Sequence, residues 1–216
     1  MVLYIFDGSN GCEGDYVNTD RRAAYELKSQ FFGRICLKLG LTPNLLTAVS
    51  LIFSVIAGIV LWKGYLLWGG LLIILTSFAD MLDGATARAG KIGTTYGGIL
   101  DHVSDRYAEF FILAGILLSQ RVHAGWALFA LFGMIIASYT RAAAESIGRI
   151  ENCEVGAVGR LEKFVIILAG LAGEEFLPGY HILAICLALV GVVSYVTSIQ
   201  RLVYTKKVLS ERDSTR

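Results

Sequence analysis

The sequence reads DMLDGATAR at residues 80–88 and GGILDHVSD at residues 97–105. These two stretches contain Asp80, Asp83, Asp101 and Asp105, and strongly apolar segments lie on either side of them. A carboxylate inside a membrane span is costly, so acids in such a position are candidate functional residues. Four of them, with glycines and an arginine between, predict a site for divalent metal ions and phosphate.

The composition is that of a membrane protein. Hydrophobic residues make up 55% of the 216 residues, whereas soluble domains contain roughly 45–50% on a comparable count. Four runs without charge account for the excess, and they cover residues 45–62, 64–79, 122–140 and 176–200. Because a spanning helix needs roughly 20 mostly apolar residues, the chain is predicted to be an all-α integral membrane protein.

We expect six transmembrane helices. Their approximate ranges are 44–63, 65–89, 94–120, 123–147, 157–175 and 178–203. The second and third contain the aspartates, and they are counted as spans because an even number places the basic segments of the chain on one side. Basic residues mark the cytoplasmic side. Both termini and the aspartates are therefore expected to face the cytoplasm at the cell membrane.

The remaining segments are shorter. Residues 20–41 are expected to form an amphipathic helix in the cytoplasmic interface, because aromatic and aliphatic residues alternate there with basic ones. Pro43 then stands at an allowed helix start. The six-helix domain is expected to cover residues 42–205, with a cytoplasmic tail at 206–216. Residues 1–19 have no recognisable element, and we expect little order there.

The spacing of the aspartates predicts how they meet. Spacings of three and four place Asp80 with Asp83, and Asp101 with Asp105, each pair on one helix face. If the chain folds back at about residue 92, Asp83 and Asp101 lie at matching depths, and so do Asp80 and Asp105. At about 1.5 Å per residue, the two layers lie roughly 13 to 19 Å from the loop.

Four close carboxylates cannot all be ionised without countercharge. Hard divalent cations with oxygen ligands would supply it, and Gly84, Gly97 and Gly98 would let a phosphate approach closely. Two alternatives stay open. One is a buried ion-pair network of the aspartates with Arg88, Arg106 and Arg141, and the other is the ion path of a divalent-cation transporter. The arginine and glycines around the acids favour a phosphate site over an ion path.

The pattern DxxDGxxAR, eight residues, GxxxDxxxD resembles the signature of the CDP-alcohol phosphotransferase family. The chain matches every fixed position, namely Asp80, Asp83, Gly84, Ala87, Arg88, Gly97, Asp101 and Asp105. The resemblance extends to the six expected spans, to the interfacial helix and to Pro43-Asn44, and it covers roughly residues 20–205.

This resemblance implies an enzyme of phospholipid biosynthesis. Such enzymes transfer a phosphatidyl (or archaetidyl) group from a CDP-linked lipid to the hydroxyl of a small alcohol and release CMP. It implies two Mg²⁺ ions, or Mn²⁺, on the four aspartates, and Asp105 as general base. The CDP-lipid would be bound by Asn44, Gly84, Ala87, Arg88 and Gly97. A homodimer is also implied, and no nucleic acid is expected as a partner.

Three basic residues indicate the acceptor. Arg141, Arg160 and Arg201 are expected at the cytoplasmic face, where together they would suit an acceptor that carries a phosphate. The arrangement is similar to the branch of phosphatidylinositol-phosphate and archaetidylinositol-phosphate synthases, which implies inositol phosphate. It departs from that branch at Ala143 and Gly159, where a second arginine and an acidic residue are common. Glycerol 3-phosphate and serine are the alternative acceptors, and membrane anchoring is the alternative role of the arginines.

One further acidic residue lies close to the motif. Glu109 follows Asp105 by one helical turn on the same face. The alternatives for it are an ion pair with Arg106, an ion pair with Arg141, or a supporting position next to the metal ligands.

Overall fold

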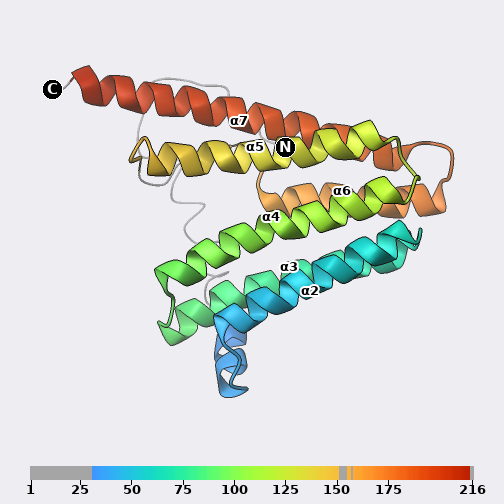
Figure 1. Cartoon of the computed structure of the whole chain (residues 1–216), viewed down its shortest axis with the longest axis horizontal. Coiled ribbons are helices and arrows are strands. Elements are labelled where there is room, and N and C mark those ends of the chain that lie inside the picture. The colour runs from blue at the N-terminus through green and yellow to red at the C-terminus, as the bar shows by residue number, and fades with distance from the viewer. Residues whose placement is uncertain (1–30, 151–154, 157, 215–216) are drawn as a thin grey trace. The chain divides into compact units, whose positions relative to one another are not determined.

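The computed structural model describes residues 31–150, 155–156 and 158–214, and every regular element in these ranges is a helix (Figure 1). A short helical segment covers residues 31–38. It is followed by α2 (Pro43–Trp62), α3 (Leu66–Gly90), α4 (Thr95–Leu118), α5 (Ala124–Ser146), α6 (Arg160–Phe176) and α7 (Ile182–Ser214). The expectations for residues 1–19, and for the first part of the interfacial helix, lie outside the described residues.

Four of these helices, α2, α3, α5 and α7, are long and apolar enough to cross a membrane. The prediction of an all-α membrane protein is therefore confirmed. A helix also lies at each of the other two predicted spans, but α4 and α6 are different in character. Helix α4 carries four charged side chains between Asp101 and Glu109, and α6 has only 17 residues. The number of six spans stays a prediction.

Helix α7 extends well beyond the apolar run that predicted it. It contains 33 residues and continues through Lys206 and Lys207 to Ser214. Near its end, Nη1 of Arg212 donates a hydrogen bond to the carbonyl oxygen of Gly148, at 3.1 Å. The predicted tail is thus helical as far as residue 214, and its charged extension is attached to the turn that follows α5.

The chain divides into two compact units. The first contains Met1–Val55 and Ile74–Ala108, and the second contains Ile56–Ile73 and Glu109–Arg216. Helices α2, α3 and α4 each contribute residues to both units. All four aspartates of the motif belong to the first unit, whereas the three arginines predicted to bind the acceptor belong to the second.

In the first unit, the segment 31–38 packs directly on α3. A Cβ atom on Gly33 would collide with the backbone carbonyl of Ala85, so only glycine permits this close approach. The ring of Phe32 also meets that of Phe78 edge-to-face, with centroids 6.3 Å apart. The described part of the expected interfacial helix is therefore held against the helix that carries Asp80 and Asp83.

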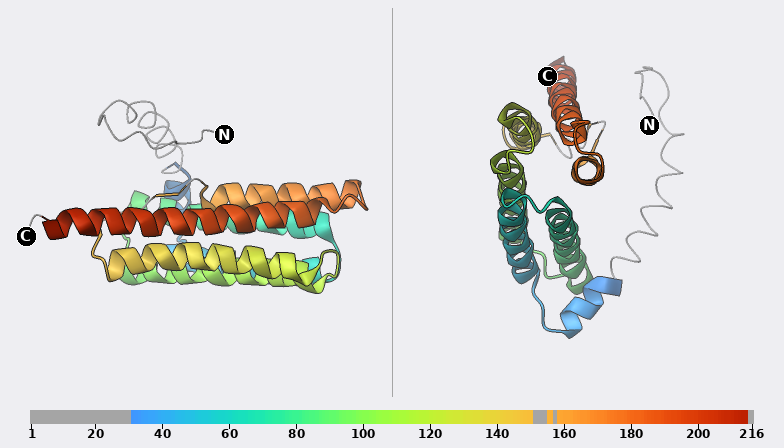
Figure 2. Two further views of the ribbon diagram at one scale, coloured as in Figure 1. Left: turned by 90° about the horizontal axis from the view of Figure 1, so that it is seen from above. Right: turned by 90° about the vertical axis from the view of Figure 1, so that its right-hand side faces the viewer.

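The second unit contains a continuous apolar core, to which α4, α5, α6 and α7 and parts of α2 and α3 contribute. Helix α7 lies beside both α5 and α6 (Figure 2). Small residues allow the close packing of α5 on α7, because a Cβ atom on Gly133 would lie only 3.1 Å from the carbonyl oxygen of Gly191. A hydrogen bond of 2.8 Å between the hydroxyls of Thr140 and Ser198 joins the same two helices.

Candidate functional site

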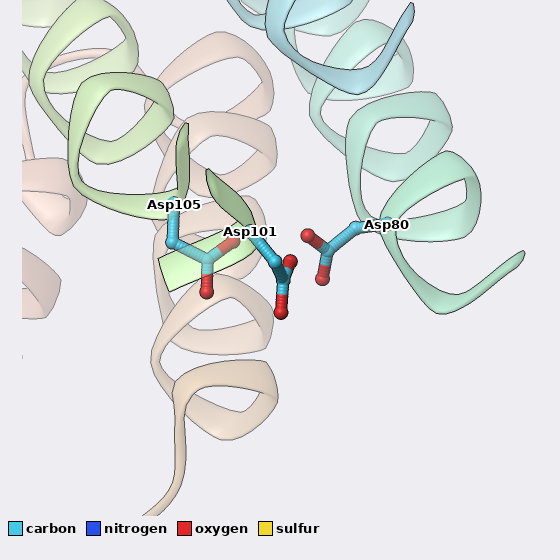
Figure 3. Close-up of side chains that lie close together, drawn as sticks. All are labelled: Asp80, Asp101 and Asp105. Atoms are coloured by element: carbon cyan, nitrogen blue, oxygen red, sulfur yellow. The ribbon is translucent and has the colours of Figure 1, made fainter. Parts of the chain in front are cut away.

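Three aspartates of the first unit converge. They are Asp80 on α3 and Asp101 and Asp105 on α4. One carboxylate oxygen of each lies within 4.8 Å of the other two. Figure 3 shows the three carboxylates turned toward one another from the two helices. Each residue is only partly buried, so the cluster is open to an ion and to a substrate.

The turn between α3 and α4 brings these residues together. Helix α3 ends at Gly90, the next residue, Lys91, has a φ of 52°, and Thr94 precedes α4. The hydroxyl of Thr94 accepts the backbone N–H of Gly97 at 3.0 Å and so satisfies one of the open donors at the start of α4. The turn lies close to the predicted residue 92, which explains why spacing alone anticipated that acids of the two helices would meet.

The three carboxylates fit a hard divalent cation. All their ligand atoms are oxygens, the type that Mg²⁺ and Mn²⁺ prefer. Around an octahedral Mg²⁺, ligand oxygens are about 3.0 Å apart when adjacent and about 4.2 Å apart when opposite. The carboxylate oxygens lie within 4.8 Å of one another, so the side chains would move inward for all three to bind one ion.

Asp83 lies outside this group of three. It is only 6% exposed, and its Oδ2 accepts a hydrogen bond of 2.7 Å from the hydroxyl of Thr47 on α2. Its role as a metal ligand stays a prediction. Sequence reasoning missed Thr47. The signal for it was a buried polar face on an apolar helix, formed by Thr47, Ser50 and Ser54 at helical spacing.

Replacement of Thr47 by Val is expected to weaken the site. Valine has nearly the same shape but removes a hydrogen bond to a carboxylate, and such bonds contribute about 1.5–3 kcal/mol. We expect the Mg²⁺ concentration for half-maximal activity to rise on the order of tenfold, and Thr47→Ser to restore it. Titration of activity with Mg²⁺ provides the measurement. An unchanged Mg²⁺ requirement in Thr47→Val would show that Asp83 needs no such support.

Basic side chains lie beside two of the clustered aspartates. Nη2 of Arg106 is 3.8 Å from Oδ2 of Asp105, and Nδ1 of the exposed His102 is 3.8 Å from Oδ2 of Asp101. Each distance is near the outer limit for an ion pair. This geometry agrees with the ion-pair alternative for Arg106.

Residues predicted to bind the CDP-lipid also lie in the first unit. The guanidinium of Arg88 folds back over Gly84, with Nη1 3.2 Å from the position that a Cβ atom would take there. At the start of α4, a Cβ atom on Gly97 would lie 3.3 Å from Oδ1 of Asn44. Ala87 is half-buried on α3. A side chain at Gly84 or Gly97 would require these flexible polar groups to shift by a few tenths of an ångström.

The three predicted acceptor arginines are each positioned by a protein group of the second unit. Nε of Arg141 donates to Oε1 of Glu145 on the same helix, at 2.8 Å. Nε of Arg160 lies 3.7 Å from Oε1 of Glu109. A guanidinium has five N–H donors, so one such contact does not exhaust its capacity to bind a phosphate.

Arg201 also forms hydrogen bonds to two backbone carbonyl groups of the second unit. Its Nε donates to the carbonyl oxygen of Val155 at 2.9 Å, and its Nη1 donates to the carbonyl oxygen of Ala137 on α5. The next residue in the loop, Gly156, has no room for a side chain, because a Cβ atom there would lie 2.7 Å from Cγ2 of Thr197. Arg201 thus joins α7 to α5 and to the loop before α6.

Comparisons with known proteins match nearly the whole helical domain. The family model described as CDP-alcohol phosphatidyltransferase matches residues 40–204. An archaetidylinositol phosphate synthase of Methanothermobacter thermautotrophicus is 35% identical over 176 residues, which cover 81% of this chain and 88% of that protein. A phosphatidylinositol phosphate synthase of Mycolicibacterium smegmatis is 33% identical over 196 residues, covering 83% of this chain and 84% of the relative.

Solved structures of the Mycobacterium tuberculosis phosphatidylinositol phosphate synthase are similar in fold. The crystal structure with CDP-DAG bound has a TM-score of 0.73 and 29% identity, and the match covers 82% of this chain and 92% of that one. The complex with manganese and citrate also has a TM-score of 0.73, with 30% identity and coverage of 82% and 88%.

Proposed function

Because the chain belongs to the CDP-alcohol phosphatidyltransferase family, we propose that it transfers a phosphatidyl or archaetidyl group from a CDP-linked lipid to inositol phosphate. Membership makes the protein a membrane transferase of phospholipid biosynthesis. The convergence of Asp80, Asp101 and Asp105 is the observation that carries this proposal, because the three carboxylates could hold a divalent cation, and that cation would bind the charged diphosphate of such a lipid. A divalent-cation transporter is not retained, since the family consists of transferases.

The aspartates are proposed to hold two Mg²⁺ ions, or Mn²⁺, with Asp83 as the fourth ligand. When bound, the metal offsets negative charge on the diphosphate and on the leaving CMP. The oxygen-only donor set supports this assignment, and so does the solved relative that contains manganese. Thr47 holds the Asp83 carboxylate in place through its 2.7 Å hydrogen bond.

Asp105 is proposed as the general base that takes the proton of the acceptor hydroxyl. The hydroxyl oxygen then forms a bond to the phosphorus that carries the lipid, while the bond from this phosphorus to the CMP oxygen breaks and CMP leaves with the electron pair. The CDP-lipid is proposed to be bound by Asn44, Gly84, Ala87, Arg88 and Gly97. A relative solved with CDP-DAG supports that substrate class.

Arg141, Arg160 and Arg201 are proposed to bind the phosphate of the acceptor. Charge-assisted hydrogen bonds from arginine suit a phosphate, and serine would leave the three cations unused. The names of the two relatives support inositol phosphate rather than glycerol 3-phosphate as the acceptor.

We propose six membrane spans, with the site and both termini on the cytoplasmic side. Within the described residues a helix lies at each of the six predicted spans, and this supports the topology together with the asymmetric distribution of basic residues. In this topology, α4 and α6 cross the membrane with their charged residues turned away from lipid. A homodimer is also proposed, and it rests on the resemblance alone.

The test is a CMP-release assay with purified protein, CDP-lipid and a panel of alcohols. Inositol phosphate is expected to be used, and plain inositol poorly. Replacement of Arg141, Arg160 or Arg201 by Gln is expected to raise the KM for inositol phosphate on the order of tenfold or more, because a charge-assisted contact contributes about 1.5–3 kcal/mol. The KM for the CDP-lipid should change little.

The thermal midpoint of each variant must be measured alongside, because Arg201 also holds two backbone carbonyls. If glycerol 3-phosphate releases CMP much faster than inositol phosphate, the acceptor assignment is wrong. If no alcohol in the panel releases CMP, the proposed transfer itself is wrong.

A further inference from the structure

The second unit contains a buried carboxylate to which the proposed chemistry gives no role. Glu109 on α4 is 1% exposed. Its Oε1 lies 3.7 Å from Nε of Arg160, the first residue of α6. The two residues are 51 positions apart in the sequence, so this contact is made only in the folded chain.

Burial of an ionised carboxylate at this position is energetically unfavourable. Removing a charged group from water is unfavourable unless a partner compensates, and Arg160 is a partner of opposite charge. The same carboxylate also lowers the net positive charge at a residue proposed to bind phosphate. If Arg160 supplied charge alone, the site would bind an anion better without Glu109. A favourable effect of Glu109 on phosphate binding would therefore come from the orientation that it gives to the Arg160 guanidinium.

Arg160 is held from a second direction as well. Its guanidinium carbon lies 5.4 Å from the centroid of the Phe164 ring, one turn further along α6. The carboxylate near Nε and the aromatic ring together restrict the orientations open to the guanidinium. Arginine has many rotamers, and a ligand that must select one of them binds more weakly than a ligand that meets it already in place.

A second cation lies near Arg160. Lys163 follows three residues later on α6 and is buried, whereas Glu162, the acidic residue of the first turn, is exposed. The two cations and the positive end of the α6 dipole therefore lie beside the carboxylates of Glu109 and Glu162. The five donors of Arg160 also exceed what one carboxylate can accept. An ion pair with Glu109 is thus compatible with phosphate binding at the same guanidinium.

We propose that Glu109 is a positioning residue that holds the guanidinium of Arg160 in the orientation that binds the acceptor phosphate. In this role Glu109 determines how strongly the enzyme selects a phosphorylated alcohol over the plain alcohol. This inference rests on the proposed function, and it assigns Glu109 no contact with either substrate.

The decisive variant is Glu109→Gln in the full chain, assayed by CMP release. The KM for inositol phosphate is expected to rise about tenfold, while kcat and the KM for the CDP-lipid stay within about twofold of the wild type. Glu109→Asp keeps the charge and is expected to recover part of the lost affinity. A purely structural ion pair would lower the thermal midpoint without this separation of KM from kcat.

Glu174 provides a matched control. It is also a buried glutamate of the second unit, 8% exposed, and its Oε2 accepts the backbone N–H of Leu183 at 3.2 Å. It lies fourteen residues beyond Arg160 on α6, about 20 Å along the helix. Glu174→Gln is expected to lower the thermal midpoint and to leave the KM for inositol phosphate unchanged.

A double-mutant cycle tests whether Glu109 acts through Arg160. The variant that combines Glu109→Gln with Arg160→Gln is expected to have the same KM for inositol phosphate as Arg160→Gln alone. Independent effects that multiply would overturn the proposal, and so would an unchanged KM in Glu109→Gln. If Glu109→Gln does not fold, Glu109→Asp takes its place in the cycle, with the same criterion.

The two proposals fail in different ways. A wild-type protein that uses inositol phosphate, together with Glu109 variants of normal KM, overturns only the positioning role. A wild-type protein that releases no CMP with inositol phosphate overturns the acceptor assignment, and the positioning role with it.

Discussion

Removal of divalent cations with excess EDTA is expected to abolish CMP release by the purified protein, and addition of Mg²⁺ or Mn²⁺ is expected to restore it. Asp80, Asp101 and Asp105 bring three carboxylate oxygens within 4.8 Å of one another. Without a cation these groups repel one another and would repel the diphosphate of the substrate. Since a bound metal contributes several kcal/mol to such a reaction, the rate should fall on the order of a thousandfold.

A binding measurement separates the metal from the chemistry. Mn²⁺ is expected to raise the thermal midpoint of the wild-type protein in the absence of substrate. Asp80→Ala and Asp101→Ala should lose this stabilisation, together with affinity for the CDP-lipid. Full turnover in EDTA would rule out the metal site, and stabilisation by Mn²⁺ that persists in both variants would place the ion elsewhere.

Replacement of Asp105 by Asn is expected to abolish transfer while the CDP-lipid still binds. Asparagine has nearly the same size and retains one oxygen for a metal, but it cannot take the proton of the acceptor hydroxyl. General bases contribute about 10²–10⁴-fold to such rates, so kcat should fall by that factor. CMP release measures the first effect, and calorimetric titration with CDP-lipid measures the second.

The matched control is Asp213→Asn, the same change at an exposed residue near the end of α7. It is expected to leave both rate and binding unchanged. Wild-type turnover in Asp105→Asn would remove Asp105 from the role of base. Loss of CDP-lipid binding in the same variant would instead assign Asp105 chiefly to the metal.

The apolar runs located α2 and α5 to within about two residues, because uncharged segments of sufficient length can hardly form anything else in a membrane. Spacing also anticipated that acids of α3 and α4 would meet. Both inferences depend on periodicity along a single helix and on one short turn. The end of α7 was missed because its charged extension has no apolar pattern.

Contacts between distant helices could not be predicted in the same way. The hydrogen bond from Thr47 to Asp83 and the approach of Arg160 to Glu109 depend on how each helix is rotated about its own axis. Hydropathy does not determine that rotation to within one side chain. From the sequence, Glu109 was expected to pair with Arg106 or Arg141 or to support the metal ligands, and the contact with Arg160 on α6 was not anticipated.

Helix α7 offers a practical route to imaging this small protein. Its 33 residues span about 50 Å at 1.5 Å per residue, which exceeds the roughly 30 Å hydrocarbon core of a bilayer. The charged extension is attached near its end by the bond from Arg212 to Gly148. A soluble helical protein fused in register at Ser214 would continue α7 without a flexible joint. Such a fusion would give a 23.5 kDa chain a rigid extramembrane marker for aligning particles in electron cryomicroscopy.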